Sequence, residues 1–222
     1  MPSTALIDRA CDVNAANLAL GHEVFDVPGA RFVRDPRIPD IHDANHVTAI
    51  TAAAPPEIDA LLERAEREFA GFGQRVFHAD HRTPPAFEAR MQLEGYERTD
   101  ALVMLLERPP RGDPKPCDIR PVASDADWDA LVRLSDMDWA EYEARKERAE
   151  SASVGRHMAM AKRWKCPPVR YFMACAEGEP CGYFNAWEGI DGVGQVEDLF
   201  VHPDRRHRGI ATALIHHCVA DA

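Results

Sequence analysis

Apolar positions in the first half of the chain predict one long helix and several short strands. One stripe of apolar residues repeats at the 3.6-residue period of a helix face, while Glu63 and Glu66 lie on the opposite side. Pro55 and Pro56 favour the start of this helix, and Gly71 favours its end. The stripe is Ile58, Leu61, Leu62, Ala65 and Phe69, and the short strand candidates are 30–33, 46–50 and 75–78.

Two further patterns complete the first half. Thr83 precedes two prolines, so it predicts the cap of a second helix that ends near Gly95. All six residues from Ala101 to Leu106 are apolar, which is typical of a strand buried on both faces. We therefore expect a buried strand at Ala101 to Leu106.

Apolar spacing in the second half predicts a strand, two helices, three strands and a final helix, in that order. Ser124 or Asp125 can cap the first helix, and Cys166-Pro167-Pro168 ends the charged helical stretch 141–164. The strands are expected at 119–122, 169–176, 181–187 and 195–201. The inner positions are Trp128, Leu131, Val132, Ser135 and Trp139 in the first helix, and Ile210, Ala213, Leu214 and Cys218 in the last, 210–219.

A linker separates the two halves. Four prolines and one glycine lie within the nine residues from Arg108 to Pro116, a composition that continues neither a helix nor a central strand. The 222 residues correspond to about one and a half average domains. We therefore expect two half-domains, 1–108 and 117–222, joined by the linker 109–116.

Charge and cysteine content narrow the class of protein. With 26 basic and 37 acidic residues, the net charge of −11 opposes binding to nucleic acid or to an anionic membrane. No apolar run reaches the roughly 18 residues of a membrane span, and Met1 to Arg9 does not resemble a secretory signal. The six cysteines form no C-x-x-C pair, which favours reduced thiols and a cytoplasmic location. His78 and His81 have no further ligands at familiar spacing, so we expect no metal.

The segment from Val196 to Leu214 carries the sharpest chemical signal. A buried strand ends at Pro203, and a short turn rich in arginine leads directly into the last helix. Gly209 and Ala211 have little or no side chain, so a ligand can approach the main chain closely. The first amides of a helix lack intrahelical partners and lie at the positive end of its dipole. The pattern therefore indicates an anion site suited to phosphate, with added charge from Arg205, Arg206 and Arg208.

Arg206-x-x-Gly209-x-Ala211 resembles the acyl-CoA-binding motif of the GNAT superfamily of N-acetyltransferases, Arg/Gln-x-x-Gly-x-Gly/Ala. The resemblance is strong over 195–214 and looser over the rest of 117–222. It implies an α/β (α+β) fold, with a mixed, mostly antiparallel sheet flanked by helices. It also implies acetyl-CoA as co-substrate and direct transfer of an acetyl group to an amine. The residues implied in binding are Leu199, Phe200 and Val201 for the pantetheine arm, and Arg206, His207, Arg208, Gly209, Ile210, Ala211 and Thr212 for the pyrophosphate.

The resemblance also implies a carboxylate near this strand as general base, and Glu197 is the candidate. Strand alternation places Glu197, Leu199 and Val201 on one face and Asp198 and Phe200 on the other, unless a bulge shifts the register. Alternatively, either carboxylate only ends the strand in solvent or caps a neighbour. No position matches the tyrosine that serves as general acid in many relatives, because the sequence ends at Ala222 before the corresponding helix.

The first half has a fainter likeness to the same family. The segment from Ala86 to Tyr96 resembles the family's last helix, but Met91 stands where relatives carry the acid tyrosine. The stretch between Ile50 and Pro56 contains no Arg-x-x-Gly-x-Ala, so we infer a degenerate half that is structural or shapes the acceptor site. We expect strands between Arg75 and Leu106 to help complete or cover the sheet of the second half; the alternative is a missing tail that would supply those strands.

Three functions are compatible with these observations: an acetyltransferase acting on a small-molecule amine, a CoA-binding module without efficient catalysis, and an unrelated phosphate-binding protein. The acidic charge mildly favours a cationic acceptor, and a homodimer is one compatible assembly. His157 is a second candidate base or an ordinary surface histidine. The aromatic residues Trp128, Trp139, Tyr142 and Trp164 either line an acceptor pocket or pack in the core.

Overall fold

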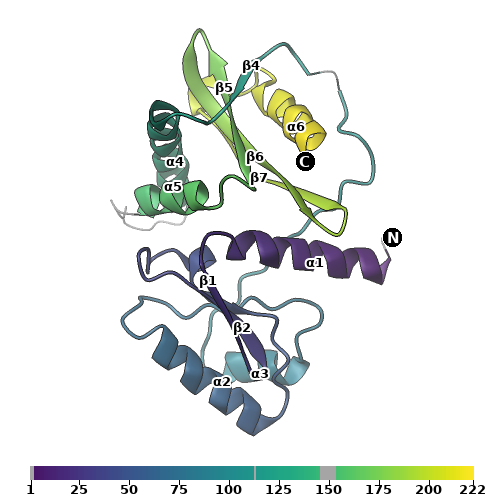
Figure 1. Cartoon of the computed structure of the whole chain (residues 1–222), viewed down its shortest axis with the longest axis vertical. Coiled ribbons are helices and arrows are strands. Elements are labelled where there is room, and N and C mark those ends of the chain that lie inside the picture. Colours follow the sequence, from purple (N-terminus) through teal and green to yellow (C-terminus); the bar gives the residue numbers. More distant parts are fainter. Residues whose placement is uncertain (1–2, 113, 146–153) are drawn as a thin grey trace. The chain divides into compact units, whose positions relative to one another are not determined.

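The computed structural model describes residues 3–112, 114–145 and 154–222, and these divide into two compact units (Figure 1). The smaller unit is Ala15–Met104, and the larger unit consists of Met1–Asn14 together with Leu105–Ala222. The first helix, α1 (Thr4–Ala19), contributes residues to both. No helix in the described ranges is both long and apolar enough to span a membrane.

The smaller unit contains an antiparallel sheet in the order β1-β2-β3 and two helices. The stripe predicted for the long helix is confirmed, because Ile58, Leu61, Ala65 and Phe69 are buried against the sheet residues Phe32 and Val47, and Leu62 is partly buried. The elements are β1 (Glu23–Val27), β2 (Ala30–Arg34), a short 3-10 turn (His42–Ala44), β3 (His46–Thr48), α2 (Pro55–Glu68) and α3 (Pro85–Leu93).

Two local predictions in this unit are wrong. The segment 75–78 is not a strand but forms one isolated parallel bridge, between Phe77 and Val47. Thr83 does not cap α3, because its Oγ1 accepts a hydrogen bond from the amide of Asp80, and the cap position is Pro84. The hydroxyl thus stabilises the preceding turn, a common alternative for threonine outside helices.

The prediction of a buried strand at Ala101 to Leu106 is also wrong. These residues form no strand, and the side chains of Leu102 and Met104 are 83% and 82% exposed. An apolar run becomes a strand only where a neighbouring strand supplies hydrogen-bond partners, and none in the described residues pairs with it. The second-half sheet contains β4 to β7 only, so in the described chain 75–106 does not complete it.

The larger unit has the predicted order of elements and an antiparallel sheet in the order β4-β5-β6-β7. Ser124 and Asp127 cap the first helix: Ser124 Oγ accepts from the Asp127 amide at 3.2 Å, and Asp127 accepts from the Ser124 amide at 2.9 Å. The bounds are β4 (Asp118–Pro121), α4 (Asp125–Arg145), α5 (Val154–Trp164), β5 (Arg170–Ala176), β6 (Glu179–Ile190), β7 (Val193–Val201), a 3-10 turn (Pro203–Arg205) and α6 (Ile210–Asp221). The part of the predicted helix 141–164 between Arg145 and Val154 lies outside the described residues.

Helices cover both faces of this sheet (Figure 1). On one face, the four inner residues predicted for α6 are all buried, and Ile210, Leu214 and Cys218 pack in one cluster with Phe172, Phe184 and Val201. On the other face, α4 and α5 lie against Tyr171 and Tyr183. The mixed, mostly antiparallel fold with flanking helices is therefore confirmed. The candidate site lies where β7 ends and α6 begins.

Candidate active site

A sharp turn connects β7 to α6. His207 and Gly209 both have left-handed backbones, with φ of +61° and +88°, and Gly209 occupies the cap position of α6. A Cβ at Gly209 would meet the side chain of Lys115 at 3.3 Å, so glycine relieves both the backbone strain and the crowding. The turn brings the chain from the end of the sheet directly to the start of a helix.

The start of α6 presents main-chain donors. The first hydrogen bond of the helix runs from the Ala213 amide to the Gly209 carbonyl at 3.0 Å. The amides of Ile210, Ala211 and Thr212 therefore have no acceptor within the helix, and they lie at its positive end. Together with the small side chains of Gly209 and Ala211, this arrangement can bind a phosphate group through the main chain.

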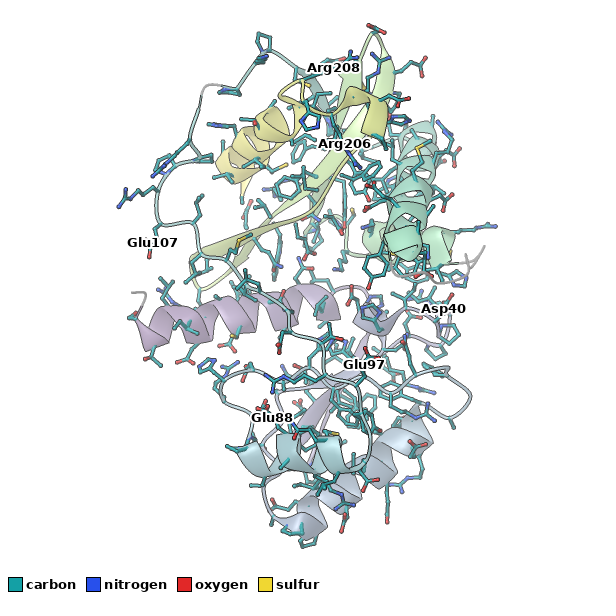
Figure 2. All side chains as sticks on the ribbon, turned by 180° about the vertical axis from the view of Figure 1, so that it is seen from behind. Asp40, Glu88, Glu97, Glu107, Arg206 and Arg208 are labelled. Atoms are coloured by element: carbon teal, nitrogen blue, oxygen red, sulfur yellow. The ribbon has the colours of Figure 1, made fainter. Side chains whose placement is uncertain are left out.

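The arginines of the turn differ in their contacts (Figure 2). Arg208 is exposed, and Arg205 pairs with Glu177 at 3.1 Å. Arg206 pairs with Glu141 of α4 through two hydrogen bonds, and this interaction raises the pKa of the guanidinium. The turn therefore carries positive charge, but the Arg206 side chain is bound within the protein.

A β-bulge interrupts β7 close to this turn. Tyr183 of β6 pairs with Phe200 and Asn185 pairs with Glu197, so one residue of β6 faces two residues of β7. Asp198, inside the bulge, has a φ of +66°. The simple alternation is therefore wrong: Glu197 lies opposite Asn185, and Asp198 also contacts Asn185, so both carboxylates share the face covered by α4 and α5. Val201 packs on α6 on the other face.

Both carboxylates are paired with lysines. Lys162 Nζ lies 2.7 Å from Asp198 Oδ2, and Lys165 Nζ lies 3.5 Å from Glu197 Oε1. Burial raises the pKa of Asp198, but the two ammonium groups outweigh it, so the pKa lies below the usual range. Tyr171 donates its hydroxyl to Asp198 at 3.3 Å. Asp198 is therefore held ionised, while Glu197 has the looser ammonium contact.

A second buried pair lies on the same face. The hydroxyl of Tyr183 donates to Asp138 of α4 at 3.2 Å. Burial raises the pKa of Tyr183 far above its ordinary value, and burial also raises the pKa of Asp138. The tyrosine therefore stays protonated and binds α4 to the sheet.

Sequence reasoning missed the two lysines and Asp138. Lys162 and Lys165 continue the spacing of the buried face of α5, at offsets of 8 and 11 residues from Val154. A charged residue at an inner helical position is a signal that it has a buried partner, and this signal was present in the sequence.

The remaining aromatic and histidine candidates lie outside the turn before α6 and the β7 bulge. Trp128 is buried beside Tyr171, with ring centroids 5.6 Å apart, so it belongs to the core. Trp139 stacks on Tyr142 at 5.1 Å near the end of α4. Trp164 and His157 are partly buried. In the smaller unit, His78 stacks on the buried His46, with ring centroids 4.2 Å apart.

Comparison with known proteins identifies the class. Residues 129–222 match the model of the acetyltransferase (GNAT) family, so this segment is a GNAT acetyltransferase domain. A GCN5-related N-acetyltransferase from Kribbella flavida superimposes with a TM-score of 0.58 and 14% identity, covering 96% of this chain and 80% of that one.

A conserved protein of unknown function from Staphylococcus epidermidis superimposes with a TM-score of 0.56 and 10% identity, covering 88% and 78%. At these identities the two likenesses show a shared fold alone. A search of curated proteins gives no significant match.

Proposed function

We propose that the protein is an N-acetyltransferase that moves an acetyl group from acetyl-CoA to the amine of a small molecule. One observation carries the proposal: within the GNAT segment, the turn from β7 to α6 presents free main-chain amides, small residues and arginine charge in one place. That donor set matches a pyrophosphate in charge and in size.

The geometry of the turn and of β7 supports the proposed binding roles. Amides from His207 to Thr212 receive the pyrophosphate, and Arg208 adds charge from an exposed position. β6 pairs with one edge of β7, and no described strand pairs with the other. The main chain of Leu199, Phe200 and Val201 at that edge is suited to the amides of the pantetheine arm. The residues proposed to contact CoA are Leu199, Phe200, Val201, His207, Arg208, Gly209, Ile210, Ala211 and Thr212, and Arg206 is proposed to hold the turn in place.

Glu197 is the proposed general base. A neutral amine attacks the thioester carbonyl carbon, a new C–N bond forms, and the C–S bond breaks as the electron pair leaves with sulfur. The proton lost by the amine passes to Glu197, whose contact with Lys165 is long at 3.5 Å. Asp198, paired with Lys162, lies on the same face of β7 as Glu197 and takes no proton in this step.

The domain roles are part of the same proposal. Residues 117–222 act as the transferase half, 109–116 as the linker, and 1–108 as a degenerate half that shapes the acceptor site or supports the fold. The acidic net charge of −11 supports an amine over a nucleic acid as partner and accords with a cytoplasmic location. No metal has a role in this mechanism.

A second candidate is a CoA-binding module with weak catalysis. The pairing of both bulge carboxylates with lysines favours it, because an ionised carboxylate bound to an ammonium group is a poorer proton acceptor.

Thiol release from acetyl-CoA, measured across a panel of small amines, separates the two candidates. The transferase releases thiol in proportion to added amine and yields an acetylated product. Tight CoA binding without amine-dependent release would support the module instead.

A further inference from the structure

Three of the five N–H groups of the Arg206 guanidinium donate to groups of the protein. Nη1 and Nη2 donate to the two carboxylate oxygens of Glu141 at 2.9 and 2.5 Å, and Nε donates to the carbonyl of Val201 at 2.9 Å. This two-pronged pairing is the same geometry that an arginine uses to hold a phosphate. Glu141 therefore occupies the pair of Nη donors that would hold a phosphate through two parallel bonds.

These three bonds join separate elements of the larger unit. Val201 is the last residue of β7, and Glu141 lies in α4. Arg206 lies in the turn (Figure 2). Three residues before Glu141, Asp138 accepts a hydrogen bond from Tyr183 of β6. One face of α4 is thus attached to the sheet at Asp138 and to the turn at Glu141.

The charge of Glu141 also matters for an anionic ligand. A carboxylate beside the turn repels a pyrophosphate unless a cation balances it, and Arg206 does so within the pair. The pair is therefore close to neutral as a unit. The main-chain amides and the exposed Arg208 are left to interact with the phosphates.

We propose that Glu141 and Arg206 form a positioning pair, which fixes the turn from His202 to Gly209 against α4 so that the amides before α6 meet the pyrophosphate. The proposal rests on the proposed CoA binding and assigns a role to Glu141, which no sequence motif marks. Arg206 acts through the turn, and Arg208 contributes the side-chain charge at the phosphates.

Isothermal titration of the full chain with CoA tests this role. Glu141→Gln should weaken CoA binding by about tenfold, the scale of one charge-assisted pair, and Arg206→Gln should do the same. The double variant should bind no more weakly than either single variant, because both remove one interaction. Asp125→Asn, which breaks an exposed α4–α5 ion pair of 2.6 Å, is the matched control and should keep wild-type affinity.

The salt dependence of CoA affinity is a second readout, because it changes when a side chain that binds the phosphate directly is removed. Arg206→Gln should keep the wild-type slope of CoA affinity against salt concentration, whereas Arg208→Gln should flatten this slope.

If Glu141→Gln fails to fold, a double variant in which the two charges are exchanged, Glu141→Arg with Arg206→Glu, takes its place. This double variant should bind CoA more tightly than Arg206→Glu alone.

Three results would overturn the positioning role: unchanged or tighter binding by Glu141→Gln, a flatter salt slope for Arg206→Gln, or no recovery in the exchanged variant. Tighter binding would mean that Glu141 competes with the phosphate for Arg206. If the wild-type chain itself does not bind CoA, the proposed function fails instead, so the two failures are distinct.

Discussion

Asp198 combines two features that are costly for a single residue. It has a left-handed backbone without being glycine, and its carboxylate is partly buried. Lys162, Tyr171 and Asn185 offset the cost of burial by donating to the same oxygen. Asp198 therefore stabilises the bulge, and both Asp198 and Glu197 lie on the face of the sheet that α4 and α5 cover.

Asp198→Asn should lower the free energy of unfolding by about 3 kcal/mol, because it leaves the Lys162 ammonium buried without its counter-ion. The matched control is Asp125→Asn, which removes an exposed pair and should change stability by at most about 0.5 kcal/mol. Urea unfolding of both variants measures the difference. Equal stability of the two variants would mean that the Asp198 pair contributes no more than a surface contact.

The low pKa of Asp198 adds a pH dependence with a definite sign. The folded pKa lies below the unfolded value, so the stabilisation is complete above the unfolded pKa of about 4 and decreases as the pH falls through the folded pKa. Asp198→Asn should therefore remove part of the loss of stability below pH 4.

Glu197→Gln should reduce the rate of acetyl transfer by at least about a hundredfold, because the amide cannot accept the proton of the amine. CoA affinity should stay at the wild-type value, since Glu197 is not among the residues proposed to contact CoA. Steady-state kinetics and titration of the same protein give the two numbers. Glu188→Gln, an exposed carboxylate on β6, is the control. An unaltered turnover in Glu197→Gln would remove Glu197 from the role of base.

Helices were predictable from the sequence to a greater degree than strands. The inner faces of α2 and α6 follow from a 3.6-residue period that is complete within each segment, so local spacing is enough. Ala101 to Leu106 shows the limit, because whether an apolar run becomes a strand depends on a partner elsewhere in the chain. Thr83 shows another limit, since a hydroxyl can bond to a turn as well as to a helix end.

The candidate site was predictable only in part, for the same physical reason. The turn from Arg206 to Ala211 is a local pattern, and the structure forms the expected strand, turn and helix there. The bulge at Asp198 depends on pairing with β6, and the bond between Arg206 and Glu141 joins residues 65 positions apart. Neither has a local signature in the sequence.

Leucines in α2 and in the segment from Ala101 to Leu106 differ in burial, so their replacement by alanine should affect stability differently. Leu61→Ala should lower the stability of the smaller unit by about 2–5 kcal/mol, because Leu61 is buried in its core. Leu102→Ala, at a side chain that is 83% exposed, should change it by at most about 0.5 kcal/mol. Chemical denaturation measures both, and a large loss for Leu102→Ala would place that segment in a packed strand after all.

At the scale of the whole chain, the two units should respond differently to acid. His46 is fully buried beside His78, and burial together with the nearby histidine lowers its pKa well below the ordinary value. In the unfolded chain His46 binds a proton near pH 6.5, whereas in the folded chain it stays neutral at this pH. The free energy of unfolding therefore falls as the pH drops below about 6.5. Burial lowers the pKa of His78 as well, in the same direction.

His46→Phe should therefore make the smaller unit less sensitive to acid between pH 6.5 and pH 5. The slope removed should approach about 1.4 kcal/mol per pH unit, the value for one proton. His207→Asn, at an exposed histidine of the larger unit, is the control and should keep the wild-type slope. Thermal unfolding at a series of pH values, followed by hydrogen exchange in Ala15–Met104, distinguishes the units. An unchanged slope in His46→Phe would mean that another group takes up the proton.

We propose that the turn before α6 binds CoA. Isothermal titration of the full chain with CoA, repeated with inorganic pyrophosphate present, is the direct test of this binding. We expect one CoA per chain, with micromolar affinity, weak competition by pyrophosphate, and loss of binding in Arg206→Glu with Gly209→Val. Binding of pyrophosphate with an affinity equal to that of CoA, or no heat of CoA binding at all, would contradict this proposal.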